Sequence, residues 1–120
     1  MSKKILDADD DSDIRNLLKI ILEENGYLVS LAANALEAVQ KAESELPHVI
    51  LLDAIDSGHV CKTLKSQERT KHIPIVSTAL SIPLEKNSKR YAQVDGHIPK
   101  PFKTEDLLSE VRKHIDIQRR

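Results

Sequence analysis

Residues 48–53 have the sequence HVILLD, a continuous apolar run that ends on a carboxylate. The run does not alternate between apolar and polar side chains, which is typical of a strand covered on both faces in a parallel sheet. Pro47 precedes it and would end a helix arriving from the N-terminal side. The sequence therefore predicts a central strand over 48–53, with Asp53 at its carboxyl end.

On both sides of this run the apolar spacing switches repeatedly between strand-like and helix-like periods. The expected strands lie near 5–6, 27–31, 48–53, 73–80 and 97–98, and the expected helices contain 14–22, 36–46, 59–66, 83–92 and 104–115. Regular alternation of this kind predicts an α/β domain with a parallel sheet and right-handed crossovers.

Apolar residues at helical spacing predict the buried stripes of these helices. The stripe residues are Ile14, Leu17, Leu18, Ile21 and Leu22; Leu36, Val39, Ala42 and Leu46; Val60, Cys61 and Leu64; and Leu107, Leu108, Val111 and Ile115. Gly26 is expected to end the first helix in a left-handed conformation, and Thr104 to cap the last one. Cys61 is expected to be a core residue rather than a reactive thiol.

The bulk properties limit the class of protein. A chain of 120 residues is the size of one domain, expected over 1–120, and a formal net charge of -1 gives no overall field that attracts nucleic acid or anionic membrane. The single cysteine excludes an internal disulfide, and no apolar stretch reaches the roughly 20 residues of a spanning helix. We expect a cytoplasmic protein that binds neither nucleic acid nor membrane directly.

Five carboxylates crowd together after the first expected strand: Asp7, Asp9, Asp10, Asp11 and Asp13. Crowded carboxylates repel one another unless a cation, a basic partner or solvent lies among them. Asp11 and Asp13 are expected to cap the following helix or to be exposed.

In a doubly wound sheet, ligands bind beyond the carboxyl ends of the strands. Asp9 and Asp10 follow the first expected strand, Asp53 ends the third, Thr78 lies in the fourth and Lys100 follows the fifth. Carboxylates, a hydroxyl and an ammonium group at one edge would suit a hard cation beside a transferred oxyanion.

Together these residues resemble the receiver domains of two-component response regulators. The segments that carry the resemblance are ADDDSDIRNLL, PHVILLD, CKTLKSQERTKHIPIV, STALS and HIPKPF, and it covers nearly the whole chain. The resemblance implies a flavodoxin-like fold, a doubly wound five-stranded parallel sheet of order 2-1-3-4-5 flanked by five helices.

The resemblance also implies that Asp53 accepts a phosphoryl group from a phosphohistidine on a histidine kinase or phosphotransferase. Asp9 and Asp10 match the acidic pair that holds Mg²⁺, with Asp53 and the backbone carbonyl of Ile55 as further ligands. The protein would then catalyse its own modification without being a turnover enzyme.

Lys100 would pair with a phosphoryl oxygen, and Thr78 would bond to another after phosphorylation draws its strand inward. Pro101 matches the family's cis peptide, which would hold Lys100 toward the acidic pocket. Helix 83–92, the strand near 97–98 and the last helix would form the face that contacts a downstream effector protein. The domain is expected to be a monomer or a weak homodimer.

The sequence departs from the family pattern at several positions. Asp7 stands where the family has an apolar strand residue, so it is expected to be paired, protonated or near an exposed strand end, and local distortion of the strand is the simplest expectation. The connection after Asp53 is about four residues shorter than the family norm, and the fourth strand is one residue short, so that Thr78 could turn away from the site. His97 occupies the position of the family's switch aromatic, and Gln93 replaces a glycine.

Two other functions stay open at this point. The shortened connection would suit a degenerate receiver that acts as a phosphorylation-independent interaction or dimerisation module. A flavodoxin-like cofactor binder has little support, because the first and third loops are acidic where a bound phosphate needs backbone N–H donors.

Overall fold

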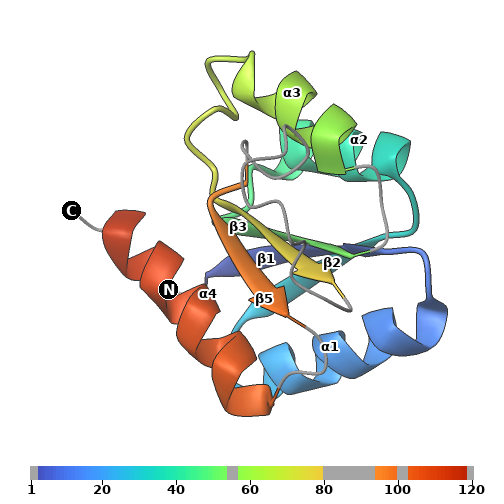
Figure 1. Cartoon of the computed structure of the whole chain (residues 1–120), viewed down its shortest axis with the longest axis vertical. Helices are drawn as coiled ribbons and strands as arrows, with labels where there is room; N and C mark the ends of the chain where they lie inside the picture. The colour runs from blue at the N-terminus through green and yellow to red at the C-terminus, as the bar shows by residue number, and fades with distance from the viewer. Residues whose placement is uncertain (1–2, 54–56, 80–93, 100–102, 119–120) are drawn as a thin grey trace.

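The computed structural model describes residues 3–53, 57–79, 94–99 and 103–118, which form a five-stranded sheet between two layers of helices (Figure 1). The strands are β1 (Lys4–Asp9), β2 (Leu28–Ala32), β3 (Val49–Asp53), β4 (Ile75–Ala79) and β5 (Gly96–Pro99). All neighbours are parallel and the order is β2-β1-β3-β4-β5. The predicted doubly wound fold is confirmed.

Four described helices cover the sheet: α1 (Ser12–Glu24), α2 (Ala35–Glu45), α3 (Ser57–Lys65) and α4 (Thr104–Gln118). α2 and α3 lie on one face, and α1 and α4 on the other (Figure 1). The helix expected over 83–92 falls outside the described residues.

The core has two parts, one on each face of the sheet. Leu6, Ile50 and Ile75 belong to the cluster on the α2 and α3 side. Ile5 and Leu51 belong to the cluster on the α1 and α4 side. Successive strand residues point to opposite faces, so the continuous apolar run of β3 supplies both clusters, as the sequence predicted.

Three of the leucines assigned to buried stripes are exposed. The exposed fraction is 52% for Leu17, 68% for Leu36 and 40% for Leu46. In α2 the buried face is instead made by Ala38, Val39 and Ala42. Small alanines let this helix lie close to the sheet, and the larger Leu36 falls beyond the edge of the contact.

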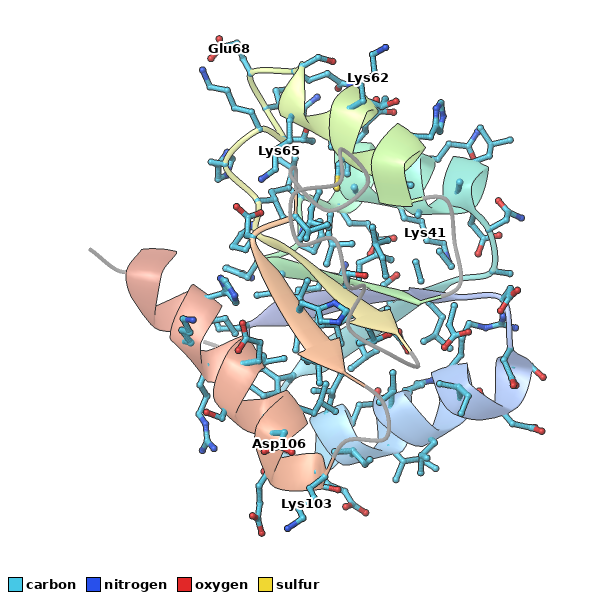
Figure 2. The ribbon with its side chains drawn as sticks, in the orientation of Figure 1. Lys41, Lys62, Lys65, Glu68, Lys103 and Asp106 are labelled. Atoms are coloured by element: carbon cyan, nitrogen blue, oxygen red, sulfur yellow. The ribbon has the colours of Figure 1, made fainter. Side chains whose placement is uncertain are left out.

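The ends of the helices follow local chemistry. Gly26 has φ +89, the left-handed conformation expected of it. The carboxylate of Asp11 accepts from the N–H groups of Asp13 and Ile14 and caps α1. At the start of α4, the Lys103 N–H donates to Asp106 Oδ2 over 3.3 Å (Figure 2).

Lys65 at the end of α3 forms hydrogen bonds near the start of β4 (Figure 2). Its Nζ donates to the Ile73 carbonyl and to Asp95 Oδ2, each over 2.9 Å. Asp95 Oδ2 also accepts from the Ile75 N–H over 2.8 Å. These contacts fix the amino ends of β4 and β5 and so help to set which residues stand at the opposite, carboxyl edge.

Within the described ranges, no helix combines the length and the apolar character needed to cross a membrane.

Candidate functional site at the carboxyl edge of the sheet

The sheet register brings three of the predicted site residues into one row. Asp9 at the end of β1 is opposite Asp53 at the end of β3, and Asp53 is opposite Thr78 in β4. Directly opposed residues of neighbouring strands are close neighbours. Positions 9, 53 and 78, far apart in the sequence, therefore meet at the carboxyl edge, where ligands bind in this class of fold.

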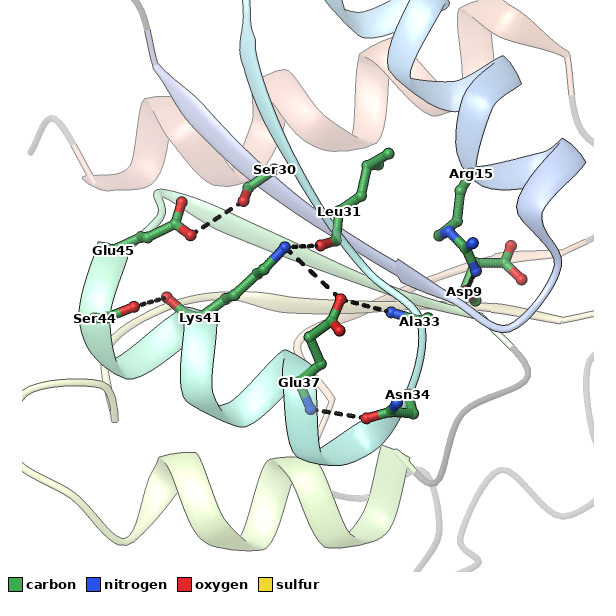
Figure 3. A network of polar contacts seen from close by, with 10 residues as sticks. All are labelled: Asp9, Arg15, Ser30, Leu31, Ala33, Asn34, Glu37, Lys41, Ser44 and Glu45. Atoms are coloured by element: carbon green, nitrogen blue, oxygen red, sulfur yellow. Dashed lines mark hydrogen bonds and ion pairs between the residues drawn. The ribbon is translucent and has the colours of Figure 1, made fainter.

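Asp9 is completely buried and tightly constrained. Its Oδ1 accepts from the Asp11 N–H over 2.9 Å. Its backbone carbonyl accepts from Arg15 Nη1 over 2.6 Å, and Figure 3 shows the guanidinium lying against the end of β1. Asp10, the next residue, is exposed. The acidic pair therefore presents one carboxylate fixed inside the fold and one open to solvent.

Thr78 does not turn away from the site, because β4 pairs with β3 without a slip and places it opposite Asp53. Its side chain is 3% exposed, and its Oγ1 donates to the Leu52 carbonyl over 3.3 Å. In this conformation the hydroxyl is bonded to the main chain of β3, next to the proposed acceptor.

Asp7 lies within β1 without distorting it. Its neighbours in the register are Leu31 in β2 and Leu51 in β3, and both ladders continue regularly past it. The prediction of local distortion at this residue is wrong. Asp7 is completely buried, on the same face of the sheet as Ile5 and Asp9.

Ile55, Lys100, Pro101 and Gln93 lie outside the described residues, as does the side chain of Asp53. In the described ranges there is no group of three or more His, Cys, Asp or Glu side chains placed to hold a metal ion. The four-member ligand set and the lysine contact therefore stay predictions.

The donor chemistry that the structure describes fits a hard cation. Asp9 offers carboxylate oxygens held in place by the fold, Asp10 offers exposed ones, and the main chain sets Asp53 opposite Asp9. Mg²⁺ prefers oxygen ligands and keeps several waters, so a few carboxylates at one edge suffice.

His97, at the family's switch position, is paired with Ser77 across the β4–β5 ladder. Burial lowers the pKa of its imidazole below the ordinary value. Cys61 is completely buried, as predicted, and desolvation raises the pKa of its thiol to about 11. A thiol with this pKa is inert at neutral pH.

Arg15 is the site contact that sequence reasoning missed. It belongs to the ADDDSDIRNLL segment, but no spacing rule predicts a side chain that reaches from the first turns of α1 back to the carbonyl of Asp9. The only feature of the sequence that points to this contact is a positively charged residue, Arg15, six positions after the proposed metal ligand Asp9.

A doubly wound sheet of order β2-β1-β3-β4-β5 with carboxylates at its carboxyl edge defines a CheY-like, flavodoxin-like α/β domain. The family model of the response regulator receiver domain matches residues 5–112. The chain therefore belongs to this family, whose members are signalling domains of two-component systems rather than turnover enzymes.

Among curated relatives, the response regulator MprA of Mycobacterium ulcerans is 36% identical over 116 residues, which are 93% of this chain and 50% of the relative. The chain thus spans about half the length of that relative. The chemotaxis protein CheY4 of Vibrio cholerae is similar in structure, with TM-score 0.86, 29% identity and coverage of 94% of this chain and 98% of that one.

A third similar structure is the receiver domain of sensor histidine kinase PA1611 from Pseudomonas aeruginosa. It has TM-score 0.87 and 23% identity, and the match covers 97% of this chain and 99% of that chain. That domain has a magnesium ion coordinated in its active site cleft.

Proposed function

We propose that the chain, as a single receiver domain over 1–120, accepts a phosphoryl group on Asp53 from a phosphohistidine of a histidine kinase or phosphotransferase. The observation that carries this proposal is the register that sets Asp53 between Asp9 and Thr78 at the carboxyl edge. A nucleophilic carboxylate, an acidic neighbour for a cation and a hydroxyl donor are what transfer to an aspartate requires.

In the proposed reaction a carboxylate oxygen of Asp53 attacks phosphorus, and an O–P bond forms. The P–N bond to the donor imidazole breaks, its electron pair stays on nitrogen, and that nitrogen takes up a proton. Asp53 becomes an acyl phosphate, and the donor histidine returns to its neutral form. No redox partner is needed.

Asp9, Asp10, Asp53 and the carbonyl of Ile55 would hold Mg²⁺. A bound Mg²⁺ supplies charge neutralisation and orientation for the phosphoryl oxygens. The PA1611 receiver domain, with magnesium in its cleft, supports such a site in this fold. Burial of Asp9 and its bond to the Asp11 N–H keep one ligand in place before the cation arrives.

Lys100 would pair with one phosphoryl oxygen and Thr78 would donate to another. Because the Thr78 hydroxyl now donates to the Leu52 carbonyl, it must exchange that bond for the phosphoryl oxygen. The exchange gives phosphorylation a way to move β4, since the hydroxyl can serve only one of the two acceptors at a time.

The shift in β4 would be read by a downstream effector protein on the face made by 83–92, β5 and α4. We also propose that the domain acts in the cytoplasm as a monomer or weak homodimer. Its near-neutral net charge supports the absence of direct contact with nucleic acid or membrane.

The test is incubation of the whole chain with acetyl phosphate and Mg²⁺, followed by intact-mass measurement. We expect the wild type to gain the mass of one phosphoryl group, Asp53→Asn to gain none, and the exposed-site control Asp13→Asn to behave as the wild type. Omission of Mg²⁺ should abolish the gain.

A wild type that stays unmodified under conditions that phosphorylate an ordinary receiver would refute the proposal. It would favour the degenerate receiver that acts as an interaction or dimerisation module. The observation behind that alternative is the early start of α3 at Ser57, which leaves only residues 54–56 to connect it to Asp53.

A further inference from the structure

Arg15 makes two contacts with the turn that joins β1 to α1. Its Nη1 donates to the Asp9 carbonyl over 2.6 Å in a partly buried contact, and its backbone N–H donates to the Asp11 carbonyl over 3.0 Å. In Figure 3 the side chain extends from α1 toward the end of β1. The backbone bond is the first i to i−4 bond of α1, so the guanidinium contact is the one that depends on the arginine side chain.

The same turn sets the direction of the Asp9 side chain. Asp9 Oδ1 accepts from the Asp11 N–H over 2.9 Å, and Asp11 in turn caps α1. The Arg15 guanidinium adds a bond to the Asp9 carbonyl, and a charged donor makes a stronger hydrogen bond than a neutral one. If it is removed, the Asp9 main chain keeps its strand partners but loses the contact that orients the turn.

We propose that Arg15 is a positioning residue for the cation site, acting through the Asp9 main chain. The inference rests on the proposed function, because it concerns the cation that Asp9 would bind. Groups that orient a metal ligand without touching the metal commonly change its affinity by 10-fold to 100-fold when they are mutated.

A competing electrostatic effect of Arg15 on the affinity for Mg²⁺ has the opposite sign. Arg15 is a permanent cation beside a proposed cation site, and its charge alone would repel Mg²⁺. If repulsion dominated, removal of Arg15 would strengthen Mg²⁺ binding. If positioning dominates, removal weakens it.

The experiment titrates Mg²⁺ into the whole chain and follows the amide signals of Asp9 and Asp10. Arg15→Met keeps an apolar stem but removes the charge and the donors, whereas Arg15→Lys keeps the charge and one donor. Arg112→Met removes an exposed arginine from α4 and serves as the matched control. We expect Arg15→Met to weaken Mg²⁺ binding about 10-fold, Arg15→Lys to recover part of the loss, and Arg112→Met to match the wild type.

A second readout needs no metal. Solvent exchange of the Asp11 N–H, measured by NMR without Mg²⁺, should be faster in Arg15→Met and intermediate in Arg15→Lys, because the turn that holds this N–H is looser. Thermal melting identifies a variant that has lost the fold. If Arg15→Met does not fold, Arg15→Lys decides, and it must show both weaker Mg²⁺ binding and faster Asp11 exchange than the wild type.

Equal or tighter Mg²⁺ binding in a folded Arg15→Met, with a wild type that does bind, would overturn the positioning role and leave the proposed function intact. A wild type that shows no saturable Mg²⁺ response would overturn both. Unchanged Asp11 exchange in Arg15→Met would overturn the mechanism by which Arg15 is said to act.

Discussion

Replacement of Asp7 by valine should stabilise the protein. Asp7 is completely buried in β1, between Leu31 and Leu51 in the register, on the side of the sheet where Ile5 and Leu51 form a core cluster. Taking an ionised carboxylate out of water costs several kcal/mol, and interactions inside a protein repay that cost only where their geometry is excellent. Burial of a valine side chain contributes about 1.5–3 kcal/mol to stability, and valine favours strands.

The expected gain follows from these opposing quantities. Replacement of buried charged groups by apolar residues of similar size changes the free energy of unfolding by between zero and about 4 kcal/mol in favour of the folded state. For Asp7→Val we expect the free energy of unfolding to rise by about 2 kcal/mol. For a domain of this size that corresponds to a rise in melting temperature of about 8 °C. Asp7→Asn removes the charge but leaves a polar amide in the core, and it should gain less than Asp7→Val.

Urea unfolding measures the effect, provided that the slope m is unchanged so that the midpoint reports stability. Asp13→Val is the matched control: Asp13 is exposed in the first turn of α1, and its replacement should give no gain. The reasoning is refuted if Asp7→Val is less stable than the wild type, and a loss of about 3 kcal/mol or more would identify a necessary buried pair. That loss is what results when one partner of a necessary buried pair is removed.

Three further predictions concern stability. Burial lowers the pKa of His48 and of His97, and the charge of Lys3 lowers the pKa of His48 further. The unfolded chain therefore binds more protons than the folded protein at acidic pH. The urea midpoint should fall as the pH drops below about 6.5. A constant midpoint from pH 7 to pH 5 would contradict this. Gly96→Ala should cost about 1–2 kcal/mol, because its Cβ would lie 2.5 Å from Glu110 Oε1 and 2.7 Å from His114 Nε2; an unchanged midpoint would show that both side chains can move aside. Leu51→Ala should cost about 3 kcal/mol, because Leu51 is fully buried in the central strand; a loss below 1 kcal/mol would mean that the core refills the cavity.

The fold could be predicted because its strongest signals are local. The apolar run of β3 and the switching period on either side predicted the kind and the order of the elements that the structure describes. The width of the buried stripe on each helix could not be predicted. A helical period identifies which face of a helix is buried, but not how wide the contact of that face with the sheet is. Leu17 and Leu36 match the period and are still exposed, since their helices contact the sheet along a narrower line.

The candidate site could be predicted only in part. Asp9, Asp53 and Thr78 each end or nearly end a strand, so topology alone placed them at one edge. The contact of Arg15 with the Asp9 carbonyl depends on the orientation of α1, which no pattern within the segment encodes.

The register that makes the site is maintained by the core beneath it. Leu51, two residues before Asp53, faces the α1 and α4 cluster, and Leu52 faces the sheet's other side with Leu6 and Ile50. A slip of one residue in β3 would move Leu51 off its own cluster and carry Asp53 out of the row with Asp9. The apolar packing that stabilises the fold is therefore also what sets the proposed phosphoacceptor beside the acidic residue, so a substitution that shifts the register should impair stability and phosphorylation together.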